Sequence, residues 1–256
     1  MELVARQVDV ISWIVTDVTR LRAVLRDTSA IVAGDVALVL FEHGALHGPT
    51  IHADIYTPHG EILPLITHLT RFEFYHSVGQ YRVPHEEAKE SLNYLVGTSQ
   101  VVYLKRGAVQ IRLIESSTIA SSSPLTSVWT TLLMNFVTAD GALCAYPGLT
   151  FRGRGLIHMP RVAHTSFPTA PNGTELAMVN SYFERGYELA GHPTDWDLDD
   201  RLEFYPCNAA PSCPAVVRFL GDKHCLCWGE IEHVVHPTDY DWLFNSAACP
   251  RAVADQ

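Results

Sequence analysis

The chain has 256 residues, of which 47% are hydrophobic and 18% are charged, and its formal net charge is −10 with histidines neutral. This balance predicts a folded globular protein and excludes an intrinsically disordered one. The negative charge repels phosphate backbones at long range, so long nucleic acids are disfavoured as partners.

The N-terminal stretch does not resemble a signal peptide, because Glu2, Arg6 and Asp9 interrupt its apolar residues. No stretch of the sequence approaches the roughly 20 apolar residues of a membrane span. We therefore expect a cytoplasmic protein that does not enter a membrane. In that compartment the six cysteines should be reduced or bound to metal rather than cross-linked.

The first half of the sequence predicts alternating helices and strands. An apolar run at 29–41 is broken by Gly34-Asp35, which predicts a strand, a tight glycine turn and a helix. Lys105-Arg106-Gly107 separates two strand-like runs and predicts a β-hairpin. The predicted elements are a helix at 16–28, the strand–turn–helix at 29–41, a loop at 42–50, a strand at 51–56, a helix at 61–69, a strand at 72–78 and hairpin strands at 100–104 and 108–116.

The second half predicts two helices and then a change in composition. Apolar residues at 125–137 predict a buried helix that Gly141 ends, and the pattern at 174–189 predicts an amphipathic helix. After residue 190 the composition shifts toward Asp, Trp, Pro and Cys. We therefore predict a mixed α/β fold with a mixed sheet flanked by helices. Residues 1–190 would form the core with a helical extension, and residues 191–256 a small cysteine-containing C-terminal appendage.

Three short motifs follow one another on the predicted strands. Gly34-Asp35 follows the first strand, His52-Ala53-Asp54 lies on the second, and Arg112 lies on the strand at 108–116. Together they resemble the nucleotidyltransferase superfamily, and more closely a group of proteins common in mushroom-forming fungi. The resemblance continues in order through the stretches 129–136, 145–147 and 149–155.

The resemblance implies a nucleotidyltransferase-like core. In that superfamily a Gly-Ser turn follows the first strand, Asp-x-Asp lies on the second, and a third Asp lies on a later strand. These carboxylates hold two divalent cations, Mg²⁺ or Mn²⁺, which align the nucleotide and stabilise the departing pyrophosphate. By position, Asp54 and Asp35 would be catalytic. His52 and Asp54 would bind metal, and Gly34 and Arg112 would bind substrate.

The departures from this pattern predict a weakened metal site. Only Asp54 remains of the three expected carboxylates. His52 is a softer ligand than Mg²⁺ prefers, and Arg112 repels a cation. Asp54 and Arg112 should share one face of the sheet, where either the two side chains form a salt bridge or Arg112 holds a phosphate directly. Glu115 should point to the opposite face.

We expect a divergent nucleotidyltransferase-fold protein that binds a nucleotide or another phosphate-bearing small molecule, with weak or lost metal-dependent transfer. One alternative is a non-catalytic pseudoenzyme that binds a ligand or a protein partner. Another is a different enzyme on the same scaffold, such as one with a His/Asp metal site. His52-x-Asp54 is half of a two-His-one-carboxylate iron site, which His85, His158 or His164 could complete. The predicted helices disfavour that site, because such oxygenases use a double-stranded β-helix.

Four cysteines near the C-terminus could hold a structural zinc ion. Cys207 and Cys213 precede Gly221-Asp222-Lys223, which predicts a hairpin, and Cys225 and Cys227 follow it. The hairpin would bring the two pairs together, with Cys225 and Cys227 on one side of a strand. The alternative is that these thiols are small buried side chains, as free cysteines commonly are.

A basic stretch contains Arg152, Arg154 and Arg161. These arginines could cradle a triphosphate or another acidic substrate. The alternative is a solvated loop. The run of Asp195, Asp197, Asp199 and Asp200 is expected to form an exposed acidic turn.

Overall fold

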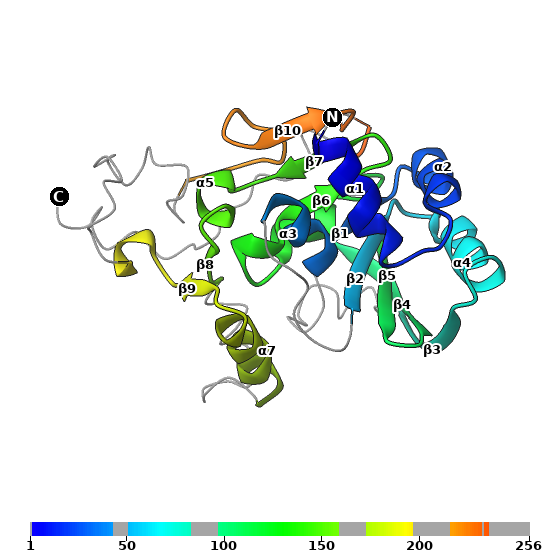
Figure 1. Ribbon diagram of the computed structural model, residues 1–256, viewed down its shortest axis with the longest axis horizontal. Coiled ribbons are helices and arrows are strands. Elements are labelled where there is room, and N and C mark those ends of the chain that lie inside the picture. The colour runs from blue at the N-terminus through cyan, green and yellow to red at the C-terminus, as the bar shows by residue number, and fades with distance from the viewer. Residues whose placement is uncertain are drawn as a thin grey trace.

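The computed structural model describes residues 2–42, 51–82, 97–158, 173–196, 216–231 and 233–235. Its main element is an eight-stranded sheet with helices packed on one face (Figure 1). The helices are α1 (Glu2–Ser12), α2 (Val18–Thr28), α3 (Asp35–Phe41), α4 (Ile62–Arg71), α5 (Pro147–Thr150) and α7 (Gly173–Glu184), with 3-10 segments η2 (Ser123–Ser127), η3 (Thr131–Leu133) and η4 (Pro193–Asp195). In the described segments, none of the helices combines the length and hydrophobicity needed to cross a bilayer.

The strands of the large sheet lie in the order β10-β7-β6-β1-β2-β5-β4-β3. They are β1 (Ile31–Ala33), β2 (Ile51–Thr57), β3 (His76–Arg82), β4 (Thr98–Arg106), β5 (Val109–Ser116), β6 (Asn135–Val137), β7 (Gly141–Cys144) and β10 (Leu226–Gly229). Only β2 and β5 pair in parallel within this sheet as described. A separate parallel pair joins β8 (Arg154–Leu156) to β9 (Glu188–Ala190). The predicted mixed α/β fold, with a mixed sheet flanked by helices, is confirmed.

Each face of the sheet carries its own hydrophobic core. Ala53 and Ile55 of β2 point to the face covered by α1, α2, α3 and α4. Tyr56 of β2 belongs to the opposite core, together with Phe136 of β6. Side chains alternate along a strand, so Asp54 lies on the same face as Tyr56.

Local sequence signals predicted the first elements correctly. The strand, glycine turn and helix expected at 29–41 are β1, Gly34 with a φ of 72°, and α3. The predicted hairpin is β4 and β5, with Gly107 at a φ of 56°. α2 accounts for the helix at 16–28, and the Asp17 carboxylate caps it by accepting a hydrogen bond from the Arg20 backbone N–H. β2 and α4 also match their predicted ranges closely.

The strand predicted at 72–78 begins four residues later than expected, as β3 at His76. Residues 72–75 instead form a turn, in which Phe74 has a φ of 58°. Glu73 and Tyr75 are buried on either side of it. The alternation of exposed and buried residues in this turn imitates that of a strand, which explains the error.

The single helix predicted at 125–137 is wrong. These residues form η2, η3 and β6 in succession, and Gly141 begins β7 instead of ending a helix. The Thr130 hydroxyl accepts a hydrogen bond from the Leu132 backbone N–H and starts the short η3 turn. The segment is buried almost throughout, so its apolar residues have no periodicity that distinguishes a helix from a strand.

The helix predicted at 174–189 is also too long. α7 ends at Glu184, and Gly186 follows with a φ of 89°. β9 then begins at Glu188 and pairs with β8. The glycine turn therefore divides the predicted helix into a helix and a strand.

β10 extends the large sheet, although it belongs to the segment predicted as an appendage. It pairs with β7 in antiparallel register, and Gly229 lies opposite Gly141. An added Cβ at Gly229 would overlap the Asp140 carbonyl oxygen, and Gly229 also has a φ of 67°. Only glycine fits this close approach between the two strands.

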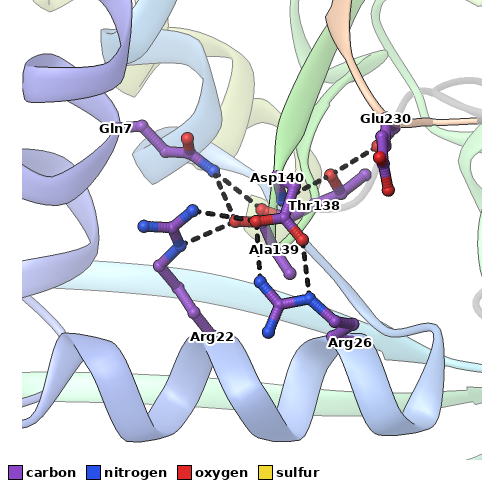
Figure 2. A network of polar contacts seen from close by, with 7 residues as sticks. All are labelled: Gln7, Arg22, Arg26, Thr138, Ala139, Asp140 and Glu230. Atoms are coloured by element: carbon purple, nitrogen blue, oxygen red, sulfur yellow. Dashed lines mark hydrogen bonds and ion pairs between the residues drawn. The ribbon is translucent and has the colours of Figure 1, made fainter.

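The turn between β6 and β7, which contains Asp140, holds two helices against the sheet (Figure 2). The Asp140 carboxylate accepts a hydrogen bond from Arg22 Nη2 at 3.0 Å and two from Arg26, at 2.8 Å from Nε and 2.7 Å from Nη2. Gln7 of α1 donates to the Thr138 carbonyl at 2.8 Å. α1 and α2 are therefore held by the same turn.

Candidate functional site

Asp54 on β2 and Arg112 on β5 form a bidentate ion pair. The two strands pair in parallel with these residues directly opposite each other. Arg112 Nε lies 2.7 Å from Asp54 Oδ1, and Arg112 Nη2 lies 2.6 Å from Asp54 Oδ2. Two parallel charge-assisted hydrogen bonds fix both the distance and the orientation of the side chains. The prediction that they share a face is confirmed, and of the two predicted alternatives the structure shows the salt bridge.

The ion pair lies at the boundary between the core and the solvent. The Asp54 side chain is 11% exposed, whereas the Arg112 side chain is 50% exposed. The negative charge of Asp54 raises the pKa of Arg112, so the guanidinium stays charged at all physiological pH values. Burial raises the pKa of the neighbouring Tyr56 phenol, which stays neutral.

The Gly34 turn packs against the Asp54 carboxylate. A Cβ at Gly34 would lie 3.2 Å from Asp54 Oδ2, and the φ of 72° is one that glycine adopts readily. A larger residue would crowd the ion pair and strain the backbone. Gly34, which follows β1, therefore lies beside the ion pair that Asp54 of β2 forms with Arg112 of β5.

The carboxylate of Asp35 is bound by α7 and the residues after it. Tyr182 Oη donates to Asp35 Oδ1 at 2.7 Å, and Arg185 Nη1 lies 3.1 Å from each Asp35 oxygen. The Arg185 guanidinium also lies over the rings of Tyr182, at 4.6 Å, and Tyr187, at 5.2 Å. These contacts give Asp35 a structural role in joining α3 to α7. The catalytic role inferred from the resemblance stays a prediction.

Tyr182, Arg185 and Tyr187 carry no local sequence signal that connects them to Asp35. Arg185 is 150 positions away from Asp35 in the chain. The Tyr187 hydroxyl also donates a hydrogen bond to the Glu42 carboxylate, just after α3. Only the three-dimensional packing of α7 against α3 reveals this polar cluster.

The residues around Asp54 do not fit a divalent cation. Both Asp54 oxygens accept hydrogen bonds from Arg112, whose positive charge opposes a cation at the same place. His52 lies two residues earlier on β2 and is exposed. Within the described ranges, no group of three or more His, Cys, Asp or Glu side chains could hold a metal ion. The donor set therefore disagrees with a two-cation centre of Mg²⁺ or Mn²⁺.

Cys225 and Cys227 lie at β10. Burial raises the pKa of the Cys225 thiol to about 12, and Arg218 Nη2 lies 3.5 Å from its Sγ. Burial also raises the pKa of Cys227. The positive charge of Arg218 beside the Cys225 sulfur opposes a cation at that place. Cys207 and Cys213 lie outside the described residues, so the four-cysteine zinc site stays a prediction.

The described arginines of the basic stretch, Arg152 and Arg154, have different surroundings. Arg154 Nε donates to Glu188 Oε2 at 2.8 Å, and its guanidinium lies 5.5 Å from the centre of the Trp196 ring. Arg152 is exposed in the turn before β8. Further predicted site residues lie outside the described residues, namely His85, His164, Arg161, Asp197, Asp199 and Asp200.

No protein-family model, curated protein or solved structure matches the chain. The order of the motifs and the geometry around Asp54 and Arg112 are therefore the observations that bear on function.

Proposed function

We propose that the chain is a divergent nucleotidyltransferase-like protein that binds a phosphate-bearing small molecule, such as a nucleotide, without metal-dependent transfer. The Asp54–Arg112 ion pair carries this proposal, because a guanidinium stands where the superfamily has a carboxylate. The order of the motifs along the chain supports a nucleotidyltransferase-like scaffold. The exposure of the Arg112 side chain supports a phosphate-bearing ligand.

The ion pair accounts for the loss of metal-dependent chemistry. A divalent cation at Asp54 would have to displace two hydrogen bonds from Arg112 and then remain beside its positive charge. The pyrophosphate charge that develops during transfer would lack its metal partners. Such losses cost several kcal/mol at the transition state.

Arg112 also has an edge that can bind an anion. Its Nε and Nη2 atoms hold Asp54, while no hydrogen bond joins Nη1 to another described residue. Half of the side chain is exposed, so a phosphate can approach. Asp54 offsets part of the positive charge, and we therefore expect a weaker affinity than at an unpaired arginine.

A second candidate is a non-catalytic protein in which the ion pair only stabilises the sheet. The bidentate geometry favours it, because Asp54 already compensates the charge of Arg112. Phosphate binding at this place would then be absent. Loss of either side chain would change stability alone.

Calorimetric titration with ATP, with Mg²⁺ and with EDTA, separates these functions. The proposal predicts binding that is equal in both buffers and weakened at least about tenfold in Arg112→Ala. Arg71→Ala is the matched control, because Arg71 is also exposed but lies at the end of α4. Thermal melting of each variant checks that it is folded.

Four outcomes would contradict the proposal. Binding that disappears with EDTA would mean that a metal site exists at carboxylates other than the paired Asp54. Binding that persists in folded Arg112→Ala would place the ligand elsewhere. Absence of binding in both buffers would favour the structural role. Release of pyrophosphate from ATP in Mg²⁺, measured separately, would overturn the loss of transfer activity.

A further inference from the structure

β3 forms one outer edge of the large sheet among the described residues. Figure 1 shows it at the end of the sheet, beside α4, and its ladder pairs it with β4. Its side chains are exposed or half-buried along the whole strand. An edge strand presents backbone N–H and C=O groups that can pair with an extended segment of another chain.

Large apolar side chains are exposed on and just before this strand. Phe72 is 43% exposed, Phe74 is 79% exposed and Val78 is 58% exposed. Phe74 also has a φ of 58°, a conformation that bulky residues rarely adopt. It is kept there because Glu73 and Tyr75, on either side, are buried. The backbone thus holds an aromatic ring in solvent at the sheet edge.

The same edge is basic in a chain that is acidic overall. Residues 71–82 and 98–106 contain four Arg and Lys residues, namely Arg71, Arg82, Lys105 and Arg106. Their single carboxylate, Glu73, is buried and paired with Arg106. The formal charge of the whole chain is −10. This local excess of positive charge is complementary to an acidic partner.

We propose that the β3 edge surface docks an acidic, extended segment of a partner protein as an added β-strand. The surface is defined by Phe72, Phe74, Val78 and Lys105. Backbone pairing with β3 would supply affinity, and Lys105, which lies opposite His76 in the register, would select acidic side chains on its face of the sheet. Phe74 and Val78 would contact the apolar side chains that alternate with them.

Bulges and charges also protect sheet edges against accidental pairing. β3 has such an irregularity between Ser77 and Gly79. Protection alone does not account for the exposed Phe74 and Val78, because exposed apolar groups promote association. From Gly79 to Arg82 the register with β4 is regular, so this part of the strand is suited to a partner strand.

The test uses a fluorescent peptide of the same length as β3, seven residues, in which glutamate and valine alternate. Fluorescence anisotropy measures its binding to the full chain. One comparison peptide has lysine in place of glutamate, and a second has proline in place of the central valine. We expect the glutamate peptide to bind at least about tenfold more tightly than either, because the others lose the charge complementarity or the backbone pairing.

Two variants test the surface itself. Phe74→Asn removes the aromatic ring, and asparagine tolerates the positive φ, so the fold is retained. Lys105→Glu reverses a charge on β4. We expect each to weaken peptide binding about tenfold. The matched control is Phe151→Asn, because Phe151 is 54% exposed but lies away from β3, and it should leave peptide binding unchanged.

Several results would overturn the proposal. If the proline peptide binds as tightly as the glutamate peptide, binding does not require strand pairing. If the lysine peptide binds as tightly, the surface does not select acidic side chains. Concentration-dependent self-association that Phe74→Asn abolishes, measured by sedimentation, would assign the edge to a second copy. Glu86, Glu87 and Glu90 make the sequence after β3 acidic. If the peptide binds only after these three residues are changed to Gln, the ligand of the β3 edge is this chain's own acidic segment.

Discussion

The Glu73 carboxylate is completely buried and lies 2.7 Å from the guanidinium of Arg106 on β4. Its Oε2 atom also accepts hydrogen bonds from the N–H and the hydroxyl of Thr16, and its Oε1 atom accepts one from the Asp17 N–H. One side chain therefore joins the connection between α1 and α2 to the far strands of the sheet.

Glu73→Gln should destabilise the protein by about 3 kcal/mol, because it leaves Arg106 without its buried counter-charge and places an amide N–H₂ against backbone donors. Urea unfolding at pH 7 measures this change. Glu61→Gln, at an exposed position before α4, is the control and should change little. A loss no larger than that of the control would show that the pair contributes no stability.

Glu73→Gln should also make the stability of the protein depend less on pH in the acidic range. Burial alone would raise the pKa of Glu73, but hydrogen bonds from Thr16, Asp17 and Arg106 lower it overall. The folded state therefore holds the proton less tightly than the unfolded state. The stabilisation is present above the ordinary pKa of glutamate, about 4.3, and is lost as pH falls through the folded value. Unfolding midpoints measured from pH 6 downward should decline more steeply in the native chain than in Glu73→Gln.

His68 on α4 should make the protein less stable in mild acid. It is 2% exposed, neither ring nitrogen has a hydrogen-bond partner among the described residues, and burial lowers its pKa. The unfolded chain binds a proton at this histidine below about pH 6.5, while the folded chain binds it only at a lower pH. Stability should therefore fall as pH drops below that value. Urea unfolding of His68→Leu at pH 7.5 and pH 5.5 should show a smaller difference than the native chain, whereas exposed His76→Leu should behave like the native chain.

Gly229→Ala should destabilise the protein by about 3 kcal/mol, because the added methyl group meets the Asp140 carbonyl oxygen and alanine resists the positive φ. Thermal unfolding followed by circular dichroism measures the change. Gly148→Ala is a matched control, since a Cβ there meets no atom within 4 Å. Equal melting temperatures for the two variants would contradict the close pairing of β10 with β7.

A double-mutant cycle measures the coupling between Asp54 and Arg112. Arg112→Gln should cost more stability than the double variant Asp54→Asn with Arg112→Gln, because it leaves the nearly buried Asp54 charge uncompensated. We expect a coupling of about 1 kcal/mol, between the values for exposed and buried pairs. A coupling near zero would mean that solvent already screens the pair. Arg20→Gln with Asp9→Asn is the control, because these exposed residues have opposite charges but form no ion pair with each other among the described contacts.

The site was predictable where short-range patterns determined it. Gly34 interrupts an apolar run, which predicted the turn, and strand alternation with the ordered motifs predicted that Asp54 and Arg112 share a face. The contact of Asp35 with Arg185 was not predictable, because no periodic pattern links positions that far apart in the chain. The prediction of a helix around Thr130 failed for a different reason. Almost every side chain in this stretch is buried, so no polar face shows whether the apolar residues repeat with the period of a helix or of a strand.

The position of β1 affects how the chain folds. β1 lies between β2, which follows it closely, and β6, which is formed by Asn135–Val137 much later in the chain. During synthesis, β1 can pair with β2 as soon as β2 has been made. The other edge of β1 stays unpaired until β6 has been synthesised. Contacts between distant positions slow folding, and an unpaired apolar edge can join another nascent chain. The yield of native protein should therefore depend on temperature and on chaperones that shield β1 until β6 emerges from the ribosome.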